Sequence, residues 1–194
     1  DVITLKFKTS YRTFKFIFSM ATTKWGIDTT HSEISFRVKH MMISNVTGWF
    51  ESFTAEAETE NDDFTAAKIN FSADTSSVNT RNEARDNHLR SGEFFASEEF
   101  PKMSFIATGY EKNGSDNTYS LKGDLTIRDI TKPVTFAVEF GGVATDPWGN
   151  LRAGFEINGE INRTDFGLTW NAVTEAGGIV VSDAVKIHSH VELI

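Results

Sequence analysis

The sequence predicts an all-β protein built as an extended, eight-stranded antiparallel barrel. The first observation is a strict alternation of apolar and polar residues from Ile34 to His40, which is the period of a strand with one buried face. The same pattern recurs along the chain and ends in Val185 to Leu193. The second observation is the fairly even spacing of these segments, with polar turns between them. Tight antiparallel links favour an up-and-down barrel over a sandwich, and eight strands leave room inside for packed side chains or one small ligand.

Each strand is predicted from its own alternation and from the turn residues that bound it. The clusters Glu60 to Asp63, Lys112 to Asn117 and Asp146 to Asn150 are typical of turns. The longest segments would span about 40 Å at about 3.4 Å per residue, which predicts an elongated tube. The eight expected strands cover residues 31–40, 46–59, 66–76, 102–111, 117–128, 133–144, 151–163 and 183–193.

One segment breaks the β pattern and predicts a short helix over residues 80–90. Thr80 can cap its start, with Glu83 three residues later as in a capping box, and Ser91-Gly92 ends it. We expect this helix to lie near one mouth of the barrel. Residues 171–182 predict a long loop.

Composition limits the class of protein. A chain of 194 residues without cysteine fits a single domain with neither disulfides nor thiolate chemistry. A net charge of −8 argues against nucleic-acid binding through the phosphates. No apolar run of about 18 residues occurs, so we expect no membrane-spanning helix. Charged residues at the outward positions predict a soluble barrel rather than one that faces lipid. The 17 Phe suit either a greasy pocket or an ordinary apolar core.

The first nineteen residues differ from the rest of the chain. They carry one acidic residue, Asp1, against the basic residues Lys6, Lys8, Arg12 and Lys15. We interpret 1–19 as an N-terminal extension or leader remnant, with Met20 as a candidate start, and 20–194 as the barrel domain. The apolar segment in 1–19 is too short for a convincing signal peptide. The expected location is therefore periplasmic or cytoplasmic.

The predicted register gives the barrel an apolar lumen, because every second residue of a strand points to the same face. The residues expected to line that lumen are Ile34, Phe36, Val38, Phe105, Leu121, Leu125, Phe136, Val138, Phe155, Ile157, Val185 and Ile187.

Three polar residues are candidates for contact with a ligand head group at a mouth. His40 continues the inward face of its strand, so it would either close the core through a hydrogen bond or meet a head group. Arg85 and His88 are three residues apart on the predicted helix and share a face that could hold an anionic group. The alternative for Arg85 is an ion-pair network with Asp86 or Glu83.

The sequence offers no recognisable catalytic or metal-binding motif, and we expect no cofactor. His188 and His190 share a face of the last strand, but Lys186 and Glu192 lie on the same face, so we expect a solvent-exposed pair rather than a metal site. No nucleophile elbow, phosphate-binding glycine loop or zinc-protease motif occurs. Arg163, at the bend after the seventh strand, is expected to have a structural role.

Several motifs, in order, resemble the YceI-like family of bacterial lipid-binding proteins, and the resemblance covers about residues 23–194. They are Trp25-Gly26-Ile27-Asp28, His31-Ser32, Phe36 to His40, Gly48-Trp49-Phe50, Arg85 to Leu89, Phe94-Phe95, Phe100 to Phe105, Gly123 to Ile127, Thr131 to Val134, Arg163 to Leu168 and Val181-Ser182-Asp183.

The resemblance implies a lipocalin-like barrel whose lumen holds a long apolar chain of a polyisoprenoid, an isoprenoid quinone or a fatty-acid derivative. We therefore expect a non-catalytic carrier or sequestering protein, in which the apolar set above contacts the chain and His40, Arg85 and His88 contact the head group. The alternatives are an enzyme acting at the mouth on an isoprenoid or a small polar substrate, and a structural barrel with a filled core. The expected partner is the lipid itself, and the sequence leaves a homodimer open.

Overall fold

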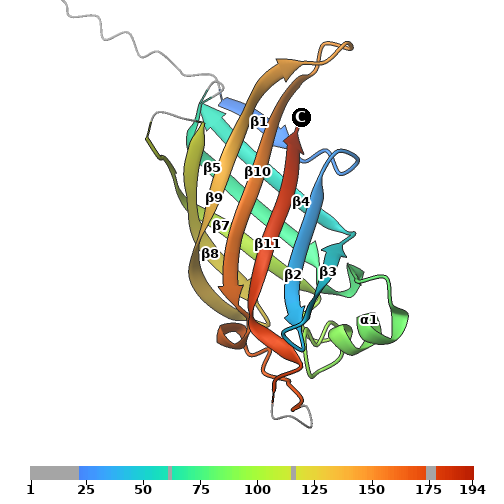
Figure 1. Ribbon diagram of the computed structural model, residues 1–194. Coiled ribbons are helices and arrows are strands. Elements are labelled where there is room, and N and C mark those ends of the chain that lie inside the picture. Colours follow the sequence, from blue (N-terminus) through green and yellow to red (C-terminus); the bar gives the residue numbers. More distant parts are fainter. Residues whose placement is uncertain (1–21, 61–62, 115–116, 174–177) are drawn as a thin grey trace, which may run out of the picture.

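The computed structural model describes residues 22–60, 63–114, 117–173 and 178–194, and it has an all-β fold with one short helix (Figure 1). The expectations for residues 1–19 and for Met20 lie outside the described residues. No helix in these ranges is both long enough and apolar enough to cross a bilayer. The elements are β1 (Thr22–Gly26), β2 (Glu33–His40), β3 (Ser44–Phe50), β4 (Phe53–Glu60), β5 (Asp63–Asp74), η1 (Thr75–Ser77), β6 (Val78–Asn79), α1 (Glu83–Arg90), β7 (Lys102–Lys112), β8 (Thr118–Ile127), β9 (Ile130–Thr145), β10 (Leu151–Asn162), η2 (Arg163–Phe166) and β11 (Val181–Leu193).

All the strands belong to one antiparallel sheet that curls strongly into a half-barrel (Figure 1). The strand order is β1-β4-β5-β7-β8-β9-β10-β11-β2-β3-β6, so most neighbours in space are also neighbours in sequence. Gly26 and Ile194 exchange two backbone hydrogen bonds of 2.8 Å, and Ile27 pairs with Leu193, which joins β1 to the end of β11. We call this the β1 end of the molecule. Helix α1 lies at the opposite end, the α1 end (Figure 1).

The predicted count of eight strands is wrong, because the described chain contains eleven. The expected strand 46–59 divides at Glu51-Ser52 into β3, which pairs with β2 and β6, and β4, which pairs with β1 and β5. The turn is fixed to its neighbours: the N–H groups of Glu51 and Ser52 donate to the carbonyl and the hydroxyl of Ser77, at 3.2 and 3.0 Å. Neither Gly nor Pro marks the break, and its sign in the sequence is the pair of consecutive polar residues Glu51 and Ser52, which interrupts the alternation. The other two additional strands, β1 and β6, are short.

Helix α1 begins later than predicted and has a different cap. The side chain of Asn82 accepts a hydrogen bond of 3.0 Å from the N–H of Arg85, which makes Asn82 the N-cap residue. The Thr80 cap was therefore a wrong prediction. The Thr80 hydroxyl instead donates to the carboxylate of Asp86, which is buried. This contact ties the helix to the segment that enters it from β6.

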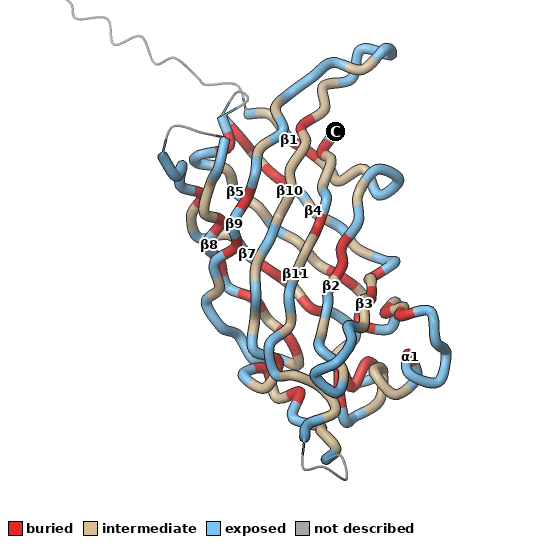
Figure 2. The backbone as a smooth tube through the Cα atoms, viewed as in Figure 1, coloured by how far each residue is buried: buried red, intermediate tan, exposed pale blue. Residues whose placement is uncertain are grey.

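Buried and exposed residues alternate along parts of the sheet (Figure 2). Along β8, Leu121 and Leu125 are buried whereas Lys122 and Asp124 are exposed. Such a pattern is typical of an antiparallel sheet with one face packed and one solvated. The inner face is therefore the part of the fold in which a ligand could be shielded from water.

Aromatic rings on the inner face pack where a neighbouring strand has a glycine. The ring of Phe136, on β9, occupies the space that a Cβ of Gly159, on β10, would need. Glycine at this point lets the backbone of β10 approach the ring closely. The same arrangement recurs in the pairs Phe36 with Gly48 and Phe105 with Gly123. Each of these rings therefore lies close to the backbone of the neighbouring strand.

Candidate ligand-binding cavity

The curled sheet contains a cavity of about 230 Å³. Among the lining residues that the structure describes, the only charged ones are Glu56 and Arg163, and most of the others are aliphatic or aromatic. All twelve residues that the sequence predicted for the lumen lie in this lining, namely Ile34, Phe36, Val38, Phe105, Leu121, Leu125, Phe136, Val138, Phe155, Ile157, Val185 and Ile187. Their contact with a ligand stays a prediction. Chemically, such a lining suits an apolar chain, because each methylene it covers is removed from water.

At the α1 end, the helix and the segment after it supply part of the lining. Leu89 of α1 lines the cavity together with Phe94 and Phe95. Phe95 makes an edge contact with the Phe50 ring, with centroids 5.6 Å apart. Helix α1 therefore contributes one apolar side chain to the inner surface, and the segment after it contributes two more.

Arg163 fixes the chain at the α1 end and is itself 5% exposed. Its guanidinium donates to the carbonyls of Leu168, Trp170 (2.8 Å) and Ser182 (3.0 Å), and it pairs with Asp183 at 3.0 Å. Burial lowers the pKa of this guanidinium from its usual value, and Asp183 opposes that shift. These contacts tie η2 and the segment after it to the start of β11, in keeping with the structural role that the sequence suggested.

At the β1 end, a continuous series of ring contacts borders the cavity. The series runs through Trp25, Phe64, Phe155, Phe140, Tyr119 and Tyr110, with centroid distances from 4.6 to 6.2 Å. Tyr110 lines the cavity and is 6% exposed. Its hydroxyl has no hydrogen-bond partner among the described residues, and burial raises the pKa of this group above its usual value. Nothing in the sequence singles out Tyr110, because a Tyr in a β strand is an ordinary core residue.

The three head-group candidates lie outside the cavity lining. Arg85 donates through Nε to the hydroxyl of Thr80 at 2.7 Å and through Nη2 to the carbonyl of Thr80 at 2.9 Å, whereas the alternative offered by the sequence was an ion-pair network with Asp86 or Glu83. His88 contacts Glu93 at 2.5 Å. His40 is half-buried at the end of β2. Their contact with a head group stays a prediction.

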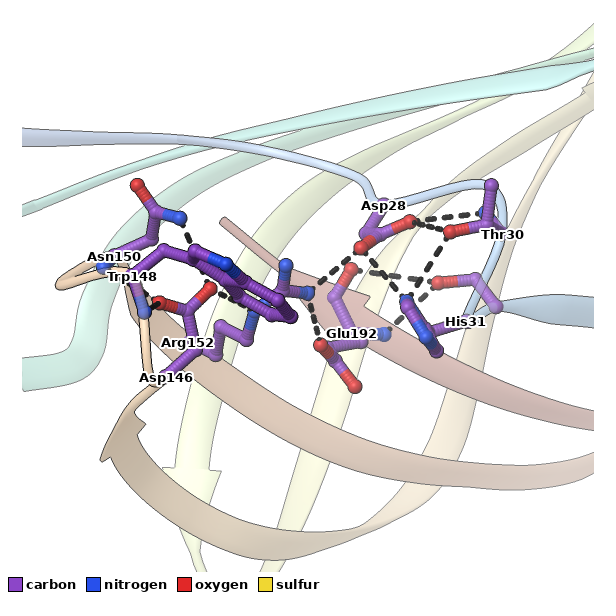
Figure 3. Close-up of polar contacts among 9 residues, drawn as sticks. Asp28, Thr30, His31, Asp146, Trp148, Asn150, Arg152 and Glu192 are labelled. Atoms are coloured by element: carbon purple, nitrogen blue, oxygen red, sulfur yellow. Dashed lines mark hydrogen bonds and ion pairs between the residues drawn. The ribbon is translucent and has the colours of Figure 1, made fainter.

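A separate polar network surrounds Arg152 at the β1 end (Figure 3). The guanidinium pairs with Asp28 at 2.7 Å, with Asp146 at 2.9 Å and also with Glu192. Hydrogen bonds from Thr30, Arg152 and His31 lower the pKa of Asp28. Asp28, His31 and Glu192 each offer one atom that could bind a metal ion, and these three atoms lie within 4.8 Å of one another. Arg152, however, already supplies the positive charge that these carboxylates need, so the arrangement is that of an ion-pair network.

His188 and His190 lie together on the outer face of β11, as the sequence predicted. Their Nε2 atoms are 3.0 Å apart, and Nδ1 of His188 is 2.6 Å from Oδ1 of Asn158. Neither residue lines the cavity.

Comparisons of the sequence with known protein families and proteins identify relatives of this chain. The model of the YceI-like domain family matches residues 25–193. The UPF0312 proteins SAS2572 and MW2606, from Staphylococcus aureus strains MSSA476 and MW2, are each 39% identical to the chain over 171 residues, which is 88% of this chain and 96% of each relative.

Three solved structures share the fold. The Campylobacter jejuni YceI protein superposes with a TM-score of 0.66 at 34% identity, over 79% of this chain and 87% of that one. Burkholderia cenocepacia BcnA superposes with a TM-score of 0.72 at 21% identity, over 86% and 98% of the two chains. A polyisoprenoid-binding domain from Saccharophagus degradans superposes with a TM-score of 0.64 at 15% identity, over 87% and 97%.

Proposed function

Because the chain belongs to the YceI-like domain family, we propose that it binds the long apolar chain of an amphiphilic lipid inside the curled sheet. The ligand class is a polyisoprenoid, an isoprenoid quinone or a fatty-acid derivative. The protein carries or sequesters this lipid without changing it chemically. The observation that supports the proposal most is the apolar lining of the cavity, to which every strand predicted to face the lumen contributes.

A second observation concerns the space inside the sheet. A structural barrel would have its interior filled by its own side chains, whereas a cavity of about 230 Å³ remains open here. The rings of Phe36, Phe105 and Phe136 take the positions left by glycines on adjacent strands, which keeps them from filling that space. The fold shared with a polyisoprenoid-binding domain is in keeping with this arrangement.

The proposal makes a quantitative statement about chain length. Burying one methylene contributes about 0.8 kcal/mol, so each added methylene should tighten binding about fourfold while the chain still fits. Affinity should therefore depend strongly on chain length and weakly on head-group charge.

The test is a titration of the protein with fatty alcohols and prenyl alcohols of increasing length, each competing against one fluorescent acyl probe. We expect saturable displacement of the probe, with affinity rising steeply and then levelling off when the cavity is full. An affinity that does not change with chain length, or an absence of saturable binding, would contradict the proposal. Recovery of a chemically altered lipid would favour an enzyme instead.

A further inference from the structure

We propose that the α1 end of the molecule docks on the surface of a lipid bilayer that contains anionic lipids. The contact is made by a docking tip, which consists of Met41, Met42 and Ile43 in the turn between β2 and β3, together with Val173 and Ile179, which precede β11. The inference rests on the proposed lipid binding, and it adds the partner from which the protein receives its ligand.

The docking tip gathers exposed apolar side chains from two segments that lie at the α1 end (Figure 1). The N–H of Met41 donates to the carbonyl of Val180 at 2.8 Å, and Val173 pairs with Ile179, so the two segments are adjacent. The exposed fractions run from 41% for Ile179 to 81% for Ile43. The tip holds half of the large apolar side chains that are exposed among the described residues. Exposed apolar residues that gather in this way mark a surface that contacts a partner or a membrane.

The turn between β2 and β3 carries apolar residues where the backbone disfavours them. Met41 and Met42 have φ values of 51° and 62°, in the left-handed region that few residues other than Gly, Asn and Asp adopt. A tight hairpin turn with this backbone usually carries Asn-Gly. Both Met side chains are exposed, so core packing does not account for them. Contact with a bilayer does, because the flexible apolar side chain of Met adapts to an irregular apolar surface.

Positive charge on the outer face beside the tip suits an anionic membrane surface. Arg37 and Lys39 are exposed on β2, and Lys186 is exposed opposite Arg37 on β11. The nearby carboxylates are Glu160, which lies opposite Lys186, and Asp183, which is already ion-paired. Cations therefore predominate here, although the chain as a whole has a net charge of −8. Basic residues that flank an apolar tip favour anionic head groups over a neutral protein partner.

The docking tip is also continuous with the cavity lining. Val38 of β2 and Val181 of β11 line the cavity, and both are close in sequence to the tip. Val181 pairs with His40, the residue before Met41. A protein docked through this tip would hold the α1 end of the cavity toward the membrane, in which a long-chain lipid is dissolved.

The experiment measures flotation of the protein with vesicles of phosphatidylcholine, either alone or mixed with phosphatidylglycerol. The test variant, Met42→Asn with Ile43→Thr, removes apolar surface and keeps a residue that suits the turn. The matched control is Trp148→Gln, because Trp148 is also 81% exposed but lies in the turn between β9 and β10, at the β1 end (Figure 1). We expect the wild type and the control to bind the mixed vesicles equally, and the test variant to bind them about tenfold more weakly.

Two further readouts examine the charge and the point of contact. Lys39→Gln should weaken binding to the mixed vesicles about fivefold, and added salt should reduce this difference. The chain has no cysteine, so a polarity-sensitive dye can be attached at one chosen position. Vesicles should shift the emission of the dye to shorter wavelength when it is attached through Ile43→Cys, and leave it unchanged when it is attached through Trp148→Cys.

The docking tip would lose its assignment if the wild type did not bind the mixed vesicles, or if the test variant bound them as tightly as the wild type. An equal loss in Trp148→Gln would place the contact elsewhere and overturn it as well. A dimer in size-exclusion chromatography that only the test variant dissociates would make a second copy the partner, which would also overturn docking on a bilayer.

The proposed lipid binding is tested separately with a prenyl alcohol delivered from cyclodextrin, without vesicles. We expect the wild type and the test variant to bind this probe equally, because Met42 and Ile43 do not line the cavity. Failure of the wild type to bind the prenyl alcohol would overturn the proposed function, whereas loss of vesicle binding alone would overturn only the docking.

Discussion

Substituting Gly159 by Ala should push a ring into the cavity and weaken lipid binding. A Cβ at this position would clash with Cδ1 of Phe136, and it would lie 3.0 Å from Cε1 and 3.5 Å from Cγ of the same ring. Because these atoms belong to a side chain, we expect the ring to move more than the backbone. Since Phe136 already lines the cavity, the displaced ring takes up room that the lipid chain would use.

The size of the effect follows from the space lost. If the ring displaces about three methylenes of the ligand, the loss is about 2.4 kcal/mol, which corresponds to roughly 60-fold weaker binding. Overpacking should also lower the free energy of unfolding by about 1–3 kcal/mol. The matched control is Gly154→Ala on the same strand, because no atom lies within 4 Å of its Cβ position. We expect wild-type affinity for this control.

The assay is a titration of both variants with a fluorescent prenyl or acyl probe, together with urea unfolding to verify that each is folded. A folded Gly159→Ala protein that binds the probe as tightly as the wild type would refute the reasoning. The apolar chain of the probe would then bind outside the part of the cavity that Phe136 lines.

Three further predictions concern stability. Met41 and Met42 occupy the two central positions of a tight hairpin turn at φ values of 51° and 62°, where Asn and Gly are preferred, so the double substitution Met41→Asn with Met42→Gly should raise the urea midpoint. Arg163→Met should lower the free energy of unfolding by about 3 kcal/mol or more, measured by urea unfolding, because several buried carbonyls lose their donor. The pKa of Asp28 is lowered in the folded state, so its contribution to stability is present above the unfolded value of about 3.9 and is lost as the pH falls below it. Thermal unfolding between pH 7 and pH 2 should therefore show a steeper loss for the wild type than for Arg152→Met, and parallel curves would contradict this.

The inner face of the sheet could be predicted because it depends only on local alternation. Residues such as Leu121 and Leu125 alternate with charged neighbours, and the pleat of a strand then decides which side each one faces. The turn residues between the later strands also marked the boundaries correctly to within a few residues.

The features that escaped prediction depend on contacts between distant segments. The break at Glu51-Ser52 is fixed by Ser77, and Thr80 is drawn away from the helix cap by Asp86. The unpaired hydroxyl of Tyr110 becomes visible only when the neighbours of that group are known. Alternation cannot report such contacts, because it describes one strand at a time.

The most direct test of the central claim is to extract the purified protein with organic solvent and to identify the extract by mass spectrometry. The account predicts a lipid with a long apolar chain, in a constant ratio to protein, that is lost or reduced in Gly159→Ala and retained in Gly154→Ala. A clean extract from the wild type, together with no saturable uptake of prenyl or acyl probes, would contradict it.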